Sequence, residues 1–144
     1  MDKTDSLEKK KFERKYADLT WRIIKCAMAV HRALGNGYPE RIYQRAMAIE
    51  MDMDSLSFEW EKALSIYYRD KMIGSRRMDF LVEGIICVEL KAKGALETSH
   101  INQTINYLEA YNLEVGLLIN FGERSLNFRR LTNKKFKPVN TAAT

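Results

Sequence analysis

Cysteine, proline and long apolar runs are scarce in this sequence, and each shortage bears on the class of protein. Its 144 residues include only two prolines and two cysteines; Cys26 and Cys87 are too few for a disulfide scaffold and wrongly spaced for a zinc site. No segment approaches the roughly 18 consecutive apolar residues of a membrane span. The first residues contain no apolar run typical of a secretory signal, so we expect a cytoplasmic protein without a membrane partner.

The composition is that of one folded domain. Hydrophobic residues make up 46% and charged residues 30% of a chain long enough for one core. We expect a charged segment over residues 1–18 (a frayed helix or disordered), a domain over 19–131 and a basic tail over 132–144. The net charge of +5 is compatible with a polyanionic partner. The basic residues after Glu123 either form a solvated tail or contact phosphates: Arg124, Arg129, Arg130, Lys134, Lys135 and Lys137.

The first half of the domain predicts two helices. Four apolar residues share one face of a helix that begins near Leu19, namely Ile23, Ala27, Val30 and Leu34. Residues 35–37 are Gly-Asn-Gly, which tolerate positive φ and end this helix. A second helix is expected to begin at Pro39, because proline suits the first helical position. Its expected core stripe consists of Ile42, Ala46, Ile49 and Met53.

Beyond residue 55 the pattern favours strands. Alternation and β-branched residues predict strands over residues 57–68, 73–81 and 85–91, with turns at residues 69–71 and around Gly84. A helix over residues 98–111 follows, and then strands over residues 115–120 and 126–131. The order α-α-β-β-β-α-β-β predicts an α/β fold. Its crossover helix lets the strands on either side of it run parallel, in a mixed β-sheet flanked by helices.

Acidic residues and a lysine gather in the hairpin over residues 76–94. In the strand over residues 85–91 the even-numbered residues are apolar, and the opposite face carries Cys87, Glu89 and Lys91. Cys87 is expected to be a small packing residue. Asp79 lies on the preceding strand, and its direction depends on the hairpin register.

Two registers are considered for this hairpin. A two-residue turn at 83–84 would pair Asp79 with Val88 and place it on the apolar face. A three-residue loop at 82–84 pairs Asp79 with Cys87, so that Asp79 lies diagonal to Glu89 on one face, about 7–8 Å away at the backbone. This loop is preferred, because it also puts three apolar residues of the first strand on the core face: Met78, Phe80 and Val82.

Asp79, Glu89 and Lys91 suit metal-assisted hydrolysis of a phosphodiester. Magnesium prefers oxygen ligands and keeps several waters, so two converging carboxylates fit it. A neighbouring lysine can stabilise the phosphate or orient the attacking water. We therefore expect Mg²⁺ or Mn²⁺ as the cofactor. Without Asp79, a Glu and a Lys two residues apart would more simply be an exposed ion pair.

Asp79 followed by Glu89-Leu90-Lys91 on the next strand resembles the core motif of the PD-(D/E)XK nuclease superfamily, although Met78 takes the place of its proline. The chain is more closely similar to the small bacterial GxxExxY proteins. Residues 37–43, Gly-Tyr-Pro-Glu-Arg-Ile-Tyr, match their naming motif at every defined position. Further similar stretches lie at residues 30–35, 88–92 and 116–122, so the resemblance covers residues 19–131.

The resemblance implies a restriction-endonuclease-like core and a metal-dependent nuclease. Glu40 matches an additional acid that superfamily members supply from a helix, and would be a third metal ligand. Gln103 matches a glutamine on the helix after the strand that carries Glu89 and Lys91. Nucleic acid is the implied substrate, with DNA favoured over RNA, and a homodimer would let so small a domain engage a duplex. Without the resemblance, Glu40 would simply complement the dipole at the start of a helix.

Four further residues are candidates for contact with nucleic acid. Arg76 and Arg77 can meet phosphates, although arginines at a strand edge are also common on inert surfaces. Tyr43 lies one turn after Glu40. Tyr107 forms a polar stripe with His100 and Gln103, expected to lie opposite the apolar residues of the same helix, Ile101, Ile105 and Leu108. His31 and His100 are left out of the catalytic set.

Three functions compete at this point, of which an enzyme acting on another phosphate ester, such as a small nucleotide, would be separated from a nuclease only by a substrate screen. The first is a divalent-metal-dependent nuclease with Asp79, Glu89, Lys91, Glu40 and Gln103 in the site. The second is a non-catalytic module that keeps the fold to bind nucleic acid or a protein. The presence of all the acids argues mildly against the second function. Stabilisation by Mg²⁺ or Mn²⁺ would distinguish the first two, since a metal that binds the native site raises the melting temperature.

Overall fold

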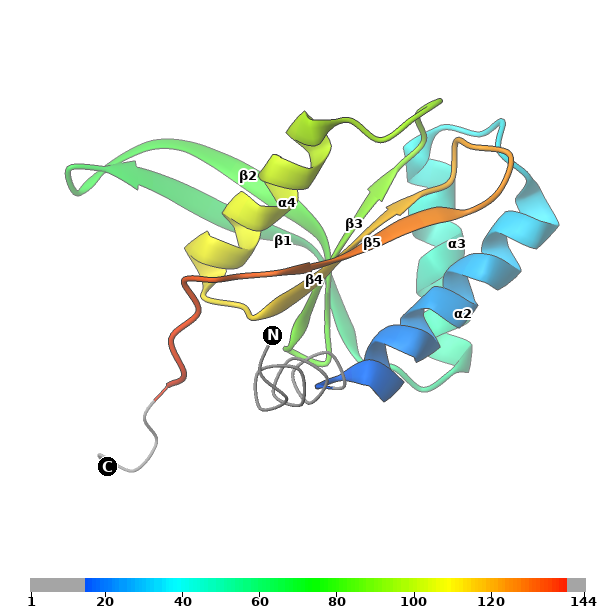
Figure 1. Ribbon diagram of the computed structural model, residues 1–144, viewed down its shortest axis with the longest axis horizontal. Coiled ribbons are helices and arrows are strands. Elements are labelled where there is room, and N and C mark those ends of the chain that lie inside the picture. Colours follow the sequence, from blue (N-terminus) through cyan, green and yellow to red (C-terminus); the bar gives the residue numbers. More distant parts are fainter. Residues whose placement is uncertain (1–14, 140–144) are drawn as a thin grey trace, which may run out of the picture.

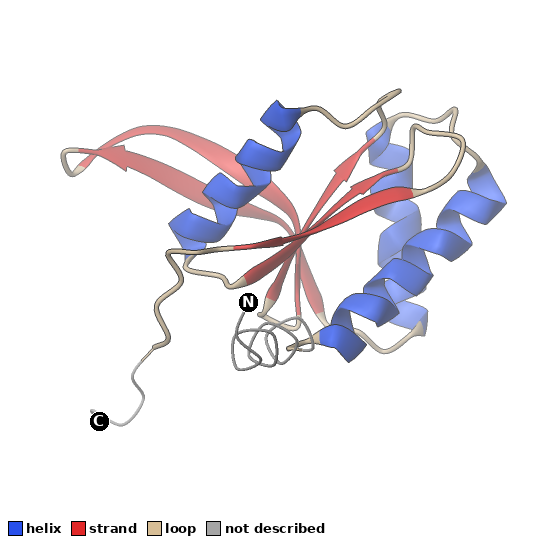
Figure 2. Cartoon of the chain, in the orientation of Figure 1, coloured by secondary structure: helices blue, strands red, loops and turns tan. Residues whose placement is uncertain are grey.

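Two helical layers cover the two faces of a single sheet (Figures 1 and 2). The computed structural model describes residues 15–139. Helices α2 (Ala17–Leu34) and α3 (Glu40–Met53) lie on one side of the sheet, and α4 (Thr98–Tyr111) lies on the other. No helix in the described part of the chain is long and apolar enough to cross a membrane.

The strands run in sequence order across the sheet: β1 (Phe58–Tyr68), β2 (Lys71–Val82), β3 (Ile86–Lys91), β4 (Val115–Asn120) and β5 (Asn127–Thr132). Only β3 and β4 pair in parallel, and α4 connects them. The expected α/β order, mixed sheet and parallel pair are therefore confirmed. The expected element boundaries differ from the observed ones by no more than two residues at each end, which is the usual scatter.

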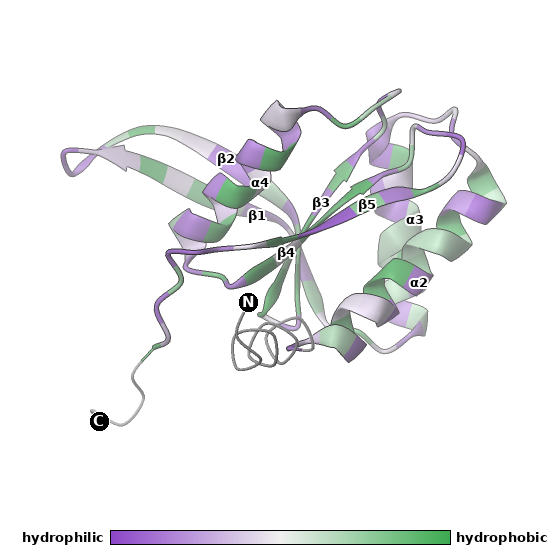
Figure 3. Ribbon diagram, in the orientation of Figure 1, coloured by the Kyte–Doolittle hydropathy of each residue, from purple (hydrophilic) through white to green (hydrophobic). Residues whose placement is uncertain are grey.

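The main core lies between the sheet and the pair α2 and α3. Ile23, Ala27 and Val30 of α2 are buried there as expected. They belong to one cluster with Phe80 and Val82 of β2, the even-numbered residues of β3 and the odd-numbered residues of β4. Figure 3 shows the hydrophobic central strands beside mixed outer elements. Gly35, with a φ of 74°, ends α2, and its N–H donates to the carbonyl of His31 at 2.8 Å.

The expected core stripe of α3 is wrong. Ile49 and Met53 are 62% and 76% exposed, whereas the buried face carries Tyr43, Met47 and Met51. The helix is apolar over a wide arc, so two stripes offset by one residue fit the same spacing. Pro39 is the residue before the helix rather than its first residue, with an extended ψ of 155°.

The loop between β2 and β3 has three residues, but not the ones expected. Val82 pairs with Ile86, so the loop is residues 83–85 rather than 82–84. Glu83 and Gly84 both have positive φ, 54° and 68°, and the N–H of Ile85 donates to the carbonyl of Val82 at 2.9 Å. Moving the loop by one residue moves the register by two, which preserves the face of every side chain. The conclusion that Asp79 shares a face with Glu89 therefore survives.

The long hairpin of β1 and β2 changes face at Asp79. Phe80 packs towards α2 and α3, but Met78 packs towards α4 with Leu64 and Tyr107, so the expected apolar face of Met78, Phe80 and Val82 is not continuous. Glu61, opposite Asp79, has a positive φ of 54°, and backbone pairing is interrupted there. Beyond this point the hairpin extends past α4 as an arm, residues 62–77 (Figure 1).

Candidate active site

Asp79 and Glu89 lie where β2 and β3 stop pairing through their backbones. The ladder between these strands covers only residues 80–82 and 86–88. The backbone N–H of Asp79 donates to Oε1 of Glu89 at 2.9 Å, and Oδ2 of Asp79 accepts from the N–H of Leu90 at 2.8 Å. Each carboxylate thus accepts a hydrogen bond from a backbone N–H, as a backbone carbonyl would in a regular sheet. Both acids are fixed by the backbone, on the face that α4 covers.

Burial makes this pair of acids unfavourable in its fully ionised form. Glu89 is 5% exposed, and burial, followed by the nearby charge of Asp79, raises its pKa. The pKa of Asp79 is also raised, first by burial and also by the charge of Glu40, while its hydrogen bond from Leu90 and the charge of Lys91 oppose the rise. A divalent cation would relieve the repulsion between a buried and a partly buried carboxylate that have too little positive charge around them.

Lys91 is the next residue on the same face of β3. Its Nζ donates to Oε1 of Gln103 at 3.4 Å, a contact that joins the end of β3 to α4. The charge of this ammonium opposes the rise in the pKa of both acids, and Gln103 from the neighbouring helix accepts a hydrogen bond from it. The structure brings together four of the residues expected from the sequence: Asp79, Glu89, Lys91 and Gln103.

The loop after Lys91 is held by the end of β4. The buried amide of Asn120 accepts from the N–H of Lys93 at 3.0 Å and donates to its carbonyl at 2.9 Å. Gly122 passes so close that an added Cβ would lie 2.4 Å from the backbone N of Lys93. The stretch over residues 116–122, which carried part of the sequence resemblance, therefore positions the strand end that bears Lys91.

Glu40 begins α3 and acts on Asp79 electrostatically, because its charge raises the pKa of that acid. Among residues 15–139, no three His, Cys, Asp or Glu side chains gather closely enough to form a metal site by themselves. Asp79 and Glu89 still fit Mg²⁺, which is bound in proteins by one or two carboxylates and keeps several waters. In this conformation the structure does not place Glu40 as a third direct ligand.

Two expected contacts with nucleic acid lie in the interior instead. Tyr43 is fully buried; its hydroxyl donates to the carbonyl of Gly35 at 2.6 Å and accepts from the N–H of Tyr38 at 3.2 Å. Its ring stacks on Phe121, 4.6 Å between centroids. Tyr107 is 5% exposed and packs on the sheet, so its stripe is not opposite the buried face of α4 but part of it. The first tyrosine holds the turn before α3. The second lines a pocket beside α4.

The arginines of the hairpin are exposed, as expected for phosphate contacts. Arg77 forms an exposed ion pair with Glu61 at 3.6 Å, and Arg76 lines a pocket beside α4. The sequence analysis missed a second basic group near the acids: Arg41 and Arg45 line a pocket of about 190 Å³ with Trp60 and Glu61. Their spacing of one helical turn, directly after Glu40, was the signal for it.

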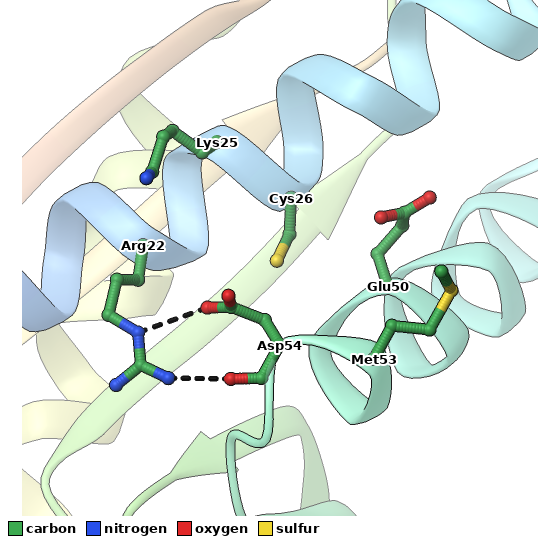
Figure 4. Close-up of a pocket in the computed structure, with 6 residues that line it drawn as sticks. All are labelled: Arg22, Lys25, Cys26, Glu50, Met53 and Asp54. Carbon is green, nitrogen blue, oxygen red and sulfur yellow. Dashed lines mark hydrogen bonds and ion pairs between the residues drawn. The ribbon is translucent and has the colours of Figure 1, made fainter.

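A further pocket, of about 300 Å³, lies between α2 and α3 and contains none of the candidate residues. Figure 4 shows Arg22 donating to Asp54 through Nε at 3.0 Å and through Nη2, to the carbonyl, at 2.6 Å. Burial and then the charge of Asp54 raise the pKa of Cys26 in its wall to about 11, so the thiol is protonated at neutral pH. This pocket is part of the contact between the two helices.

The family comparison agrees with the geometry. Residues 17–131 match the model of the family described as the PD-(D/E)XK nuclease superfamily. This match covers nearly the whole described domain, and does not separate the GxxExxY proteins from the rest of the superfamily. No curated protein and no solved structure matches the chain. PD-(D/E)XK nucleases generally use divalent metals. The chain belongs to the PD-(D/E)XK nuclease superfamily.

Proposed function

We propose that this protein is a nuclease that hydrolyses phosphodiester bonds of nucleic acid with Mg²⁺ or Mn²⁺, and that DNA is preferred over RNA. The observation that carries the proposal is the Asp79–Glu89 pair, fixed by backbone hydrogen bonds of 2.9 Å and 2.8 Å beside the ammonium of Lys91. An inert fold has no evident reason to keep a buried and a partly buried acid side by side, both with raised pKa values.

Asp79 and Glu89 would hold the cation, which when bound would neutralise charge on the phosphate and make water more acidic. Lys91 would hold the phosphate or orient the attacking water, since its ammonium carries three donors at the edge of the acid pair. Gln103 would keep Lys91 in place through the contact to its Oε1. Glu40 would act at longer range, as a negative charge that strengthens cation binding.

The surrounding cations support a polyanionic substrate. Arg41 and Arg45 line a pocket with Trp60, and Arg76 and Arg77 lie on the hairpin. Phosphate contacts of this kind position a strand without reading its sequence. Substrate binding should therefore weaken steeply as the salt concentration rises.

The decisive experiment is cleavage of fluorescent single- and double-stranded DNA and RNA in Mg²⁺, Mn²⁺ or EDTA. We expect metal-dependent cutting that falls by at least about 100-fold in Lys91→Ala, the usual cost of removing one group that stabilises the transition state. Lys93→Ala is the matched control, because it removes an exposed lysine two residues away. Equal cutting by wild type and Lys91→Ala would contradict the proposal, and so would loss of cutting in Lys93→Ala alone.

A non-catalytic module that binds nucleic acid is the second candidate. It is favoured by one observation, the lack of three clustered metal-binding side chains among residues 15–139. The melting temperature separates the two functions, since Mg²⁺ or Mn²⁺ must stabilise a protein that binds it in the native state. Stabilisation that Asp79→Asn abolishes would support the nuclease. Nucleic-acid binding without any metal-induced stabilisation or cutting would support the module.

A further inference from the structure

A pocket of about 280 Å³ lies between the arm of the hairpin and α4, on the same side of the sheet as the acids. Leu64 and Ile66 of β1 form one apolar wall, and Tyr107 and Ala110 of α4 form the other. Its polar lining consists of the guanidinium of Arg76 and the side-chain amides of Gln103 and Asn106. We call these seven residues the arm pocket.

The arm pocket is continuous with the candidate active site. Gln103 belongs to both, because its Oε1 accepts from Lys91 at 3.4 Å while its side chain lines the pocket. Tyr107 lies within electrostatic reach of both as well. Its pKa is raised to about 12, first by burial and then by the charge of Glu89, whereas the charge of Arg76 lowers it. A group bound in the pocket would thus lie next to the bond cut at the acids.

The polar groups of the pocket have unused bonding capacity. Among residues 15–139, neither the Arg76 guanidinium nor the Asn106 amide has a side-chain hydrogen bond or an ion-pair partner. The amide N–H₂ of Gln103 is also without an acceptor in that range. Amides can pair with both donors and acceptors on a flat ring edge, and a guanidinium can bind phosphate or stack on a base.

We infer that the arm pocket receives an unpaired nucleobase of the strand that is cut, so that the substrate is single-stranded or locally opened nucleic acid. The inference rests on the proposed function and narrows its substrate. Apolar walls suit the faces of a base, the two amides suit its edge, and Arg76 suits the attached phosphate. A base stacked within a duplex can enter such a pocket only after it is extruded, which costs a few kcal/mol of unstacking.

The end of the arm fits the same substrate. Tyr67 and Tyr68 are 63% and 62% exposed, and the guanidinium of Arg69 lies 5.6 Å from the centroid of the Tyr68 ring. Exposed aromatic rings beside cations are the usual platform for successive unpaired bases. The arm, residues 62–77, carries Lys62, Arg69, Lys71, Arg76 and Arg77 against the single acid Asp70. Its charge therefore attracts a nucleic-acid strand and opposes a basic copy of the same chain.

The test compares strands that differ only in whether their central nucleotides carry bases. Fluorescence anisotropy in EDTA, at low salt, would give the affinity of the full-length protein for a short single strand and for the same strand with central abasic sites, as DNA and as RNA. Both strands carry the same phosphate charge. We expect the abasic strand to bind roughly tenfold more weakly, because one stacked base contributes about 1–3 kcal/mol. A duplex of the same sequence should also bind more weakly than the single strand.

Ala110→Trp fills the pocket from the exposed side of α4, and Asn102→Trp is the matched control, because Asn102 is exposed on the same helix but does not line the pocket. We expect the difference between intact and abasic strands to vanish in Ala110→Trp and to persist in Asn102→Trp, with unchanged melting temperatures. Equal affinity of wild type for intact and abasic strands would overturn the inference. So would a dimer in sedimentation that Ala110→Trp dissociates, since the pocket would then be a protein interface.

The outcomes separate this inference from the proposed nuclease. If the wild type discriminates against abasic strands but cuts nothing, even in Mg²⁺ or Mn²⁺, the base-binding pocket is supported and the nuclease function is refuted. A wild type that cuts intact and abasic strands at equal rates, in a reaction that requires Lys91, would retain the nuclease and refute the pocket.

Discussion

The two faces of the sheet are built differently, and the difference explains where a site can exist. The face towards α2 and α3 is a continuous apolar core that includes the rings of Phe80, Tyr43 and Phe121. The face towards α4 has a smaller cluster, with Leu64, Met78 and Leu108, and it also carries Asp79 and Glu89. Burial on the first face stabilises the fold. The second face has fewer apolar contacts and retains buried polar groups. The free-energy cost of burying these groups must be offset by apolar burial on the first face.

The largest effect is expected where the apolar face is broken. Phe80 is fully buried and contacts Phe58 and Trp60, with ring centroids 5.4 Å and 6.2 Å away. Phe80→Ala should lower the free energy of unfolding by about 3–5 kcal/mol, because the cavity forfeits both transfer energy and packing. Urea unfolding measures this. Ile73→Ala on the arm, where the side chain is 67% exposed, is the comparison and should cost well under 1 kcal/mol. Similar losses at both positions would mean that burial on the face towards α2 and α3 does not stabilise the fold as described.

A second test changes Gly122, in the loop after β4, because this loop contacts the one that follows Lys91. In Gly122→Ala the new Cβ would lie 2.4 Å from both the N and the O of Lys93, so backbone must move. We expect a loss of about 1–3 kcal/mol of stability, and a fall in kcat larger than any rise in KM, because the end of the strand bearing Lys91 shifts. Gly94→Ala, in the loop that also contains Lys93, meets nothing within 4 Å and should change neither quantity appreciably. A stable, fully active Gly122→Ala protein would show that this contact does not position Lys91.

Much of this contrast follows from the sequence, because it depends on periodicity. The stripe of Ile23, Ala27 and Val30, the apolar run of β4 and the alternation of β3 each has one interpretation, and all three are confirmed. The prediction that Asp79 and Glu89 share a face was correct, although the predicted loop between their strands began one residue too early. A hairpin can shift its register by two without changing any face, so the argument from faces could not detect that displacement.

The rest depends on contacts that a sequence pattern does not encode. The α3 helix offers two apolar stripes, and only its packing against the sheet selects the one with Tyr43 and Met47. The change of face at Asp79 results from the positive φ of Glu61, a residue type that carries no sign of it. The burial of Tyr107 and the arm pocket beside it depend on how α4 lies against a hairpin distant in sequence.

The pair Asp79 and Glu89 predicts that the stability of the protein depends on pH. Because the pKa values of Asp79 and Glu89 are raised by folding, the folded protein retains protons that the unfolded chain releases from about pH 4 upwards. In EDTA, stability should therefore fall as the pH rises above that value. Burial raises the pKa of Glu89 to about 9, so the wild type must take up a proton on folding at pH 8, and Glu89→Gln has no such cost. The substitution should raise the free energy of unfolding at pH 8 by on the order of 1–2 kcal/mol. It should also abolish stabilisation by Mg²⁺. Thermal unfolding at pH 5 and pH 8, with the exposed Asp52→Asn as control, would measure both effects. A wild type equally stable at both pH values in EDTA would contradict a buried, unneutralised pair.

The smallest effect on stability is expected from the hydroxyl of Tyr43, a polar group within the face towards α2 and α3. Its removal also tests whether Tyr43 supports the fold or contacts the substrate. The hydroxyl of Tyr43 connects the carbonyl of Gly35 and the N–H of Tyr38, so it closes the turn that leads to Glu40. Tyr43→Phe keeps the ring stacked on Phe121 but leaves those backbone groups without this partner, and should cost about 1–2 kcal/mol of stability. Because the ring is fully buried, affinity for single-stranded nucleic acid should not change. Tyr38→Phe is the control, since that ring is 49% exposed and its removed hydroxyl holds no turn. If Tyr43→Phe weakened binding while melting like the wild type, Tyr43 would contact the substrate, and the apolar face would have to open when nucleic acid binds.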